Sequence, residues 1–178
     1  MNSKVARRVI DNYLATSEAK HYIRNEDLTS LYDSCQFMYI SELTKKLYEC
    51  GVNPLEYLTV IPVMYAQNIV LPETTIIIPS NITRIEPRAF RNSTVHEVIF
   101  EEGCETIGGS VFAECLLERV VLPKSLKKLG QNAFKGIYRN VDVHYRGTAT
   151  DWKKIIRLDK FPYTVHCIDY DIEPEEEQ

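Results

Sequence analysis

The 178-residue chain lacks the features that define several large classes of protein. No apolar run approaches the roughly 20 residues that a membrane-spanning helix needs, so we predict no membrane segment. The formal net charge of −4 gives no overall attraction to nucleic acid. The sequence contains no glycine-rich phosphate loop, no Gly-x-Ser-x-Gly and no His-Glu-x-x-His. We therefore predict that the protein is not an enzyme and binds no cofactor.

The cysteines do not form a pattern that predicts disulfides. There are five, an odd number, and none stands in a Cys-x-x-Cys pair. Disulfide frameworks are normally denser and even in number, so we expect reduced thiols that pack as small apolar residues. The first 20 residues carry basic side chains but no apolar core segment or small-residue cleavage site, which predicts an amphipathic helix and no signal peptide. Together these features favour a cytoplasmic protein.

Histidine is also scarce, with four in the chain. His144 and His166 would lie on neighbouring strands, and Asp169 is close to them in sequence. Two histidines and a carboxylate can hold a metal ion, but no spacing here matches a known metal motif. We predict no metal site.

The strongest signal in the sequence is a period of 22 residues. Phe90, Phe112 and Phe134 are separated by this interval, and three further sets of residues share it: Ile85, Ile107 and Leu129; Ile78, Phe100 and Leu122; Ile77, Ile99 and Val121. A fixed period of this size predicts a solenoid, in which each repeat buries its apolar side against its neighbours. Solenoids usually present a surface, so the period points to binding.

We predict three parts in the chain. Residues 1–73 form a helical N-terminal subdomain or cap, residues 74–172 form the solenoid with a C-terminal cap, and residues 173–178 form an acidic, disordered tail. In the first part we expect helices near residues 5–14, from residue 25, and near 43–48 with Gly51 as a stop. A further helix would begin at Asn53 and kink or end before Pro62.

The third repeat resembles a known family. Residues 117–134 read Leu-Glu-Arg-Val-Val-Leu-Pro-Lys-Ser-Leu-Lys-Lys-Leu-Gly-Gln-Asn-Ala-Phe, which is similar to the BspA-type leucine-rich repeat. Gly108 and Gly130 fall on the glycine of that pattern, whereas Glu86 departs from it. The stretch from Tyr145 through Trp152 to Ile155 resembles the last repeat of such arrays. The resemblance covers about residues 74–170. It implies an α+β protein in which the helical segment precedes a short leucine-rich-repeat β-solenoid with a parallel sheet.

Alternation along the strands predicts which residues face outward. If Val120 and Leu122 point into the stack, Val121 points out. The outward columns are then Ile77, Ile99, Val121 and His144; Thr75, Glu97, Arg119 and Asp142; and Pro79, Glu101, Pro123 and Arg146. An apolar strip on an open sheet often marks an interaction site. Two further interpretations remain open: the β-branched residues simply suit a strand, or the front helices fold over them.

These observations predict a non-catalytic protein–protein interaction module that presents a rigid parallel-sheet surface. The candidate partner-binding residues are Ile77, Ile99, Val121, His144, Glu97, Glu101 and Arg119. A basic edge formed by Lys124, Lys127 and Lys128 is the second candidate, although solvated lysines are the default interpretation. The partner would be a protein, nucleic acid is disfavoured, and a homo-oligomer through the strip is an open hypothesis. The same features also suit a small phage or mobile-element inhibitor of a host protein, or a fragment of a cell-surface adhesin.

Overall fold

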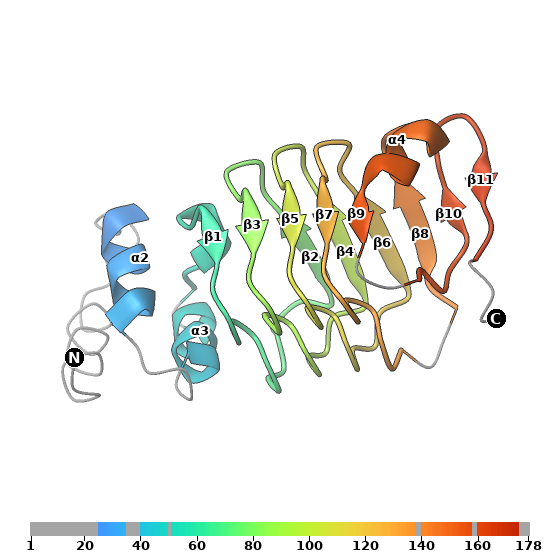
Figure 1. Cartoon of the computed structure of the whole chain (residues 1–178). Helices are drawn as coiled ribbons and strands as arrows, with labels where there is room; N and C mark the ends of the chain where they lie inside the picture. Colours follow the sequence, from blue (N-terminus) through green and yellow to red (C-terminus); the bar gives the residue numbers. More distant parts are fainter. Residues whose placement is uncertain (1–24, 35–39, 50, 138–139, 158–159, 175–178) are drawn as a thin grey trace.

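A computed structural model describes residues 25–34, 40–49, 51–137, 140–157 and 160–174. The fold is an α+β solenoid in which two sheets run along the axis and short helices lie at the ends (Figure 1). The five-stranded sheet is parallel and follows the order β1 (Val60–Ile61), β3 (Arg84–Ile85), β5 (Thr106–Ile107), β7 (Lys128–Leu129) and β9 (Ile156–Arg157). Among the described helices, none is long and apolar enough to cross a membrane.

The six-stranded sheet lies behind the first in Figure 1. Its strands, from one edge to the other, are β2 (Thr75–Ile78), β4 (Glu97–Phe100), β6 (Arg119–Leu122), β8 (Asp142–Tyr145), β10 (Val165–His166) and β11 (Asp171–Ile172). All neighbouring pairs are parallel except β10 and β11, which are antiparallel. In this sheet Ile77 pairs with Ile99 and Ile99 with Val121, so the 22-residue period equals one coil of the solenoid, as predicted.

The interior between the sheets contains a continuous row of aromatic rings. Phe90, Phe112 and Phe134 are buried and stacked, with 5.5 Å between the centroids of successive rings. Tyr65 extends the row at one end, 5.5 Å from Phe90, and Phe161 extends it at the other, 5.6 Å from Phe134. The predicted structural role of the three phenylalanines is confirmed.

The five-stranded sheet was not predicted, because its strands are only two residues long. β1, β3, β5 and β7 each place one side chain inward, and Ile85, Ile107 and Leu129 are buried in register, whereas neither residue of β9 is buried. These are residues that the period had already aligned. Two residues are too few to show alternation, so the second sheet became visible only when the coils were stacked.

The described N-terminal helices match the prediction. α2 spans Asn25–Ser34 and α3 spans Ile40–Glu49. Gly51 ends α3 with a φ of +71°, and its N–H donates to the Tyr48 carbonyl while the Val52 N–H donates to that of Leu47. This pair of hydrogen bonds is the Schellman motif, a helix termination that favours glycine. The helix expected near residues 5–14 lies outside the described residues.

The helix expected to begin at Asn53 is wrong beyond its first turn. Asn53 does act as a cap, since its Oδ1 accepts the N–H of Leu55, but only the 3-10 turn η3 (Pro54–Glu56) follows. The chain then enters β1, where the carbonyls of Thr59 and Ile61 accept N–H groups from the next coil. Ile61 is fully buried opposite Ile85. Burial and inter-coil pairing therefore override the local helical pattern.

The described helices pack on the first coil. Leu28, Leu31, Leu43 and Leu47 belong to the same apolar core as the repeats, and Tyr32 lies 5.9 Å from Tyr65 between ring centroids. This confirms that the segment before the repeats closes their first coil. The division at residues 73 and 172 stays a prediction, and the acidic tail beyond residue 174 lies outside the described residues.

The C-terminal cap is built around Trp152, as predicted. α4 (Ala149–Lys154) begins with a capping box, in which Thr148 and Asp151 exchange side-chain and backbone hydrogen bonds. Trp152 is buried, with ring centroids 5.3 Å from Tyr145 and 5.1 Å from Phe161. Strand β10 then covers the edge of β8.

The aromatic row should carry much of the stability. Phe112 contacts a ring on each side, so Phe112→Ala should lower the free energy of unfolding by about 3–5 kcal/mol. Phe112→Leu, which keeps most of the apolar volume, should cost less. Chemical denaturation measures both, and a loss below about 1 kcal/mol for the alanine variant would contradict the stacked core.

The cap should be similarly sensitive. Trp152→Ala should cost about 3–5 kcal/mol, because it removes contacts with two rings of the last coil. The Trp152 Nε1 is buried without a hydrogen-bond partner in the described part of the chain, so Trp152→Phe should be tolerated better. Thermal unfolding tests this, and an alanine variant as stable as the parent would show that the cap assignment is wrong.

Candidate functional site

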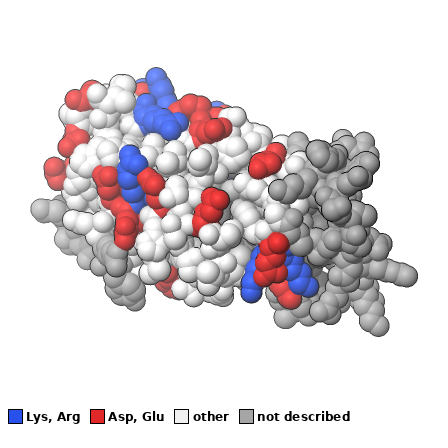
Figure 2. Space-filling view, turned by 180° about the vertical axis from the view of Figure 1, so that it is seen from behind, with Lys and Arg blue, Asp and Glu red and all other residues white. Residues whose placement is uncertain are grey.

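The outer face of the six-stranded sheet carries the candidate residues in three parallel columns. We call Ile77, Ile99, Val121 and His144 the outer strip, and strand pairing places each beside the next. The side chain of Ile77 is exposed, whereas Ile99 and Val121 are half-buried by their neighbours. Figure 2 looks toward this side and shows a mostly uncharged surface, interrupted by small groups in which Lys or Arg lies next to Asp or Glu.

The described helices do not bury the strip. Ile77 is 55% exposed although it lies on β2, the edge strand of the six-stranded sheet on the side of the N-terminal helices. One of the three interpretations was that the front helices fold over the strip. Neither α2 nor α3 does so. Residues 1–24 lie outside the described residues.

A row of polar contacts runs along one flank of the strip. We call Thr75, Glu97, Arg119 and Asp142 the charged column. Thr75 Oγ1 donates to Glu97 at 3.2 Å, and Arg119 donates to Glu97 Oε1 at 2.6 Å. The Nε of Arg119 also lies 3.5 Å from a carboxylate oxygen of Asp142. Alternating charge across neighbouring strands keeps these side chains extended along the sheet.

The charged column continues into a pair of histidines. His144 Nε2 lies 2.9 Å from Asp142 Oδ1, and the rings of His144 and His166 are 5.1 Å apart. His166 Nδ1 in turn lies 3.0 Å from Asp171 Oδ1. The 22-residue interval between the histidines places them on adjacent strands, as expected, but nothing in the period could have located Asp171 on the antiparallel strand β11.

Asp169, the predicted neighbour of the histidines, makes its hydrogen bond to a different part of the chain. Its Oδ1 accepts the N–H of Ala149 at the start of α4. Within the described ranges, no group of three or more histidine, cysteine or acidic residues is arranged to hold a metal ion.

The third column lies in the turns that follow the strands, and its acidic member has a structural contact. Glu101 Oε2 accepts the N–H of Ser80 on the preceding coil at 2.9 Å. The adjacent Glu102 accepts the N–H groups of Lys124 and Ser125 on the next coil. Glu101 is therefore a coil-to-coil link as well as a candidate binding residue.

The basic edge is less positive than its sequence indicates. Lys124, Lys127 and Lys128 are all exposed, but Lys127 Nζ lies 2.7 Å from Glu105 Oε1. Glu102 sits beside the Lys124 backbone. Acidic side chains from the neighbouring coil thus interleave with the lysines, which weakens the case for a nucleic-acid surface.

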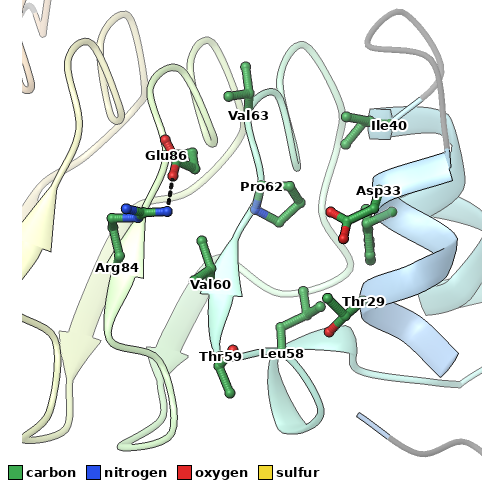
Figure 3. A pocket seen from close by; sticks show the side chains of 11 residues that line it. Thr29, Asp33, Ile40, Leu58, Thr59, Val60, Pro62, Val63, Arg84 and Glu86 are labelled. Atoms are coloured by element: carbon green, nitrogen blue, oxygen red, sulfur yellow. Dashed lines mark ion pairs between the residues drawn. The ribbon is translucent and has the colours of Figure 1, made fainter. Parts of the chain in front are cut away.

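Two hollows flank the first coil. One, of about 470 Å³, lies between α2 and β1. Figure 3 shows Thr29 and Asp33 of α2 on one side, Pro62 between, and the Arg84–Glu86 ion pair of 2.8 Å on the other. Its lining among the described residues combines two carboxylates and Arg84 with threonine and apolar side chains, and includes no histidine or cysteine of the described part of the chain. The second hollow, of about 450 Å³, lies beside β2 and was not predicted.

The described buried cysteines are structural. Burial raises the pKa of the Cys104 thiol to about 12, and burial also raises the pKa of Cys115. Cys115 Sγ lies 3.0 Å from the Phe90 carbonyl and 3.6 Å from Ser93 Oγ, so it joins one coil to the preceding one. Thiols held protonated in this way are poor nucleophiles. Cys104, Cys115 and Cys167 are free, and Cys35 and Cys50 lie outside the described residues.

These features define a parallel β-solenoid of the leucine-rich repeat class. The family model described as BspA type Leucine rich repeat region matches residues 67–152 in six copies. This match identifies the repeats within residues 67–152 as BspA-type leucine-rich repeats. Comparison with curated proteins and with solved structures finds no match. Family and fold together are those of protein-interaction or adhesin-like modules, which are generally non-catalytic.

The charged column should contribute little to stability. The side chains of Glu97 and Arg119 are 26% and 45% exposed, and exposed ion pairs are worth about 0–1 kcal/mol. Arg119→Met, which keeps the aliphatic stem, should therefore change the free energy of unfolding by less than about 1 kcal/mol. Urea denaturation at low and high salt measures this. A loss of several kcal/mol would mean that the column is a structural element and not a free surface.

Proposed function

We propose that the protein binds another protein through the outer strip and the charged column. The observation that carries this proposal is the unbroken column of Ile77, Ile99 and Val121 on an open sheet, in register across three strands. Strand propensity alone would account for single β-branched residues but gives no reason for an apolar column beside a charged one. The repeat family supports a binding role in general terms.

The two columns would contribute differently to binding. Burial of the apolar strip supplies the favourable desolvation that interface centres use. Glu97 and Arg119 beside it can fix the orientation of a partner and reject one with the wrong charge pattern. Because the strip lies on strands tied to neighbouring coils, little conformational entropy is lost on binding.

The same surface would serve each of the partner classes that the sequence leaves open. The protein could be an inhibitor of a host protein, a fragment of a surface adhesin, or a subunit of a homo-oligomer. In each case the partner would cover the strip. His144, the last member of the strip, and Glu101 beside it belong to the proposed surface. The edge at Lys124, Lys127 and Lys128 is the second choice. The partner's identity decides among these three hypotheses, so the test must identify it.

The test is capture of a partner by immobilised protein, followed by measurement of affinity with the purified partner. Ile99→Glu combined with Val121→Lys should leave folding nearly intact, because both side chains point away from the core, and should weaken binding by at least about a hundredfold. The matched control is Thr106→Glu with Gln131→Lys, which introduces the same charges at outward positions near the five-stranded sheet. Equal affinity of parent and strip variant would show that binding occurs elsewhere.

A further inference from the structure

Strand β2 has one free edge. On its inner side, the carbonyls of Thr74 and Ile78 accept N–H groups of Glu97 and Glu101. Because parallel strands use alternate residues on their two sides, the N–H and C=O groups of Thr75 and Ile77 point away from β4. Within the described residues, β2 pairs with no strand other than β4. Thr75 and Ile77 therefore present two donors and two acceptors along one edge.

This edge opens into the hollow of about 450 Å³ beside β2. Thr75, Ile76 and Ile77 form one wall, and Tyr48, Val52 and Asn53 form part of the other. No residue of β4 lines it, so the hollow lies on the free side of β2. The far wall is held in place, since Tyr48 Oη donates to Asn53 Oδ1 at 3.2 Å and lies 3.1 Å from Tyr65 Oη.

The hollow is lined by polar and apolar side chains in similar measure, and it carries a negative charge. Glu73 is its only charged lining residue within the described chain. Burial is the main reason that the pKa of Tyr48 rises to about 12, and the nearby carboxylates of Glu73 and Glu56 raise it further. Neither carboxylate has an ion-pair partner among the described residues. A positively charged group is what the hollow would attract.

We propose that the free edge of β2 binds an extended segment of another protein, which adds a strand to the six-stranded sheet and places a basic side chain near Glu73. An extended peptide supplies alternating donors and acceptors at the spacing that Thr75 and Ile77 require. The wall at Tyr48 lies opposite this edge, across the hollow. The edge of a second folded copy would carry the same wall, so self-pairing is the less suitable arrangement. The inference stands apart from the proposed function, because it uses the backbone edge instead of the outer face.

The probe is a fluorescent peptide with the sequence of residues 118–124, Glu-Arg-Val-Val-Leu-Pro-Lys. It copies β6, a strand that already pairs within this sheet, and it carries two basic residues. The control peptide has both valines replaced by proline, which removes two N–H donors. In fluorescence anisotropy with the full chain, the probe should bind saturably and the control peptide at least about tenfold more weakly.

The decisive variant is Ile77→Pro. It removes one outward N–H, and proline is tolerated at edge positions whose N–H faces away from the sheet. The matched control, Ile77→Thr, trims the side chain on the outer face but keeps the N–H. We expect at least about a tenfold loss of affinity for Ile77→Pro, less than about twofold for Ile77→Thr, and about threefold for Glu73→Gln. If Ile77→Pro fails to fold, Thr75→Pro serves as the test variant instead, because it removes the other outward N–H.

Three results would overturn the inference. One is the absence of saturable binding by the probe, and another is unchanged affinity in a folded Ile77→Pro or Thr75→Pro variant. The third is a dimer of the full chain that Ile77→Pro dissociates and Ile77→Thr does not, because a second copy would then occupy the edge. Ile77 also belongs to the outer strip, so the Ile77→Thr control separates the loss of its side chain from the loss of its N–H, and the strip variant Ile99→Glu with Val121→Lys leaves the edge of β2 unchanged.

Discussion

The structure depends on stacking equivalent residues directly over one another from coil to coil. Parallel pairing fixes the separation of the strands, and the rings of Phe90, Phe112 and Phe134 fill the interior at 5.5 Å intervals. A coil that slipped by one residue would lose its ring contact and turn its inward side chains toward solvent. The two caps follow from the same constraint, because the first and last rings need cover. Tyr32 and Tyr65 supply it at one end, and Trp152 and Phe161 at the other.

The same stacking creates the outer surface. Whatever stands at one outward position is placed beside its equivalents, so three β-branched residues become the outer strip and the alternating charges become the charged column. Neither column is needed to hold the coils together, since the core and the backbone ladders do that. A solenoid of this kind can therefore vary its face while keeping its fold, which is the physical basis for assigning recognition to that face.

The features that recur with the 22-residue period could be predicted from the sequence. Phe112, the inward and outward columns and Gly51 as a stop follow from spacing or local chemistry, and the closing segment around Trp152 follows from the family resemblance. The prediction was wrong at residues 57–61, where burial of Ile61 outweighs a helical pattern. It also missed the five-stranded sheet, whose strands are too short to show alternation. The hollow beside β2 was not predictable either, because it forms between Tyr48, Asn53 and Thr75, which belong to different elements and share no period.

The central claim is that stacking satisfies the backbone hydrogen bonds of the inner strands and leaves the outer face of the six-stranded sheet and the edge of β2 open. Residue-resolved amide hydrogen exchange on the full chain tests it most directly. The account predicts slow exchange throughout the inner strands β4 and β6. In β2 it predicts alternation, with Ile76 and Ile78 slow and Thr75 and Ile77 fast. Uniformly slow exchange in β2 would mean that its edge is already covered, and fast exchange in β4 and β6 would contradict the stacked solenoid itself.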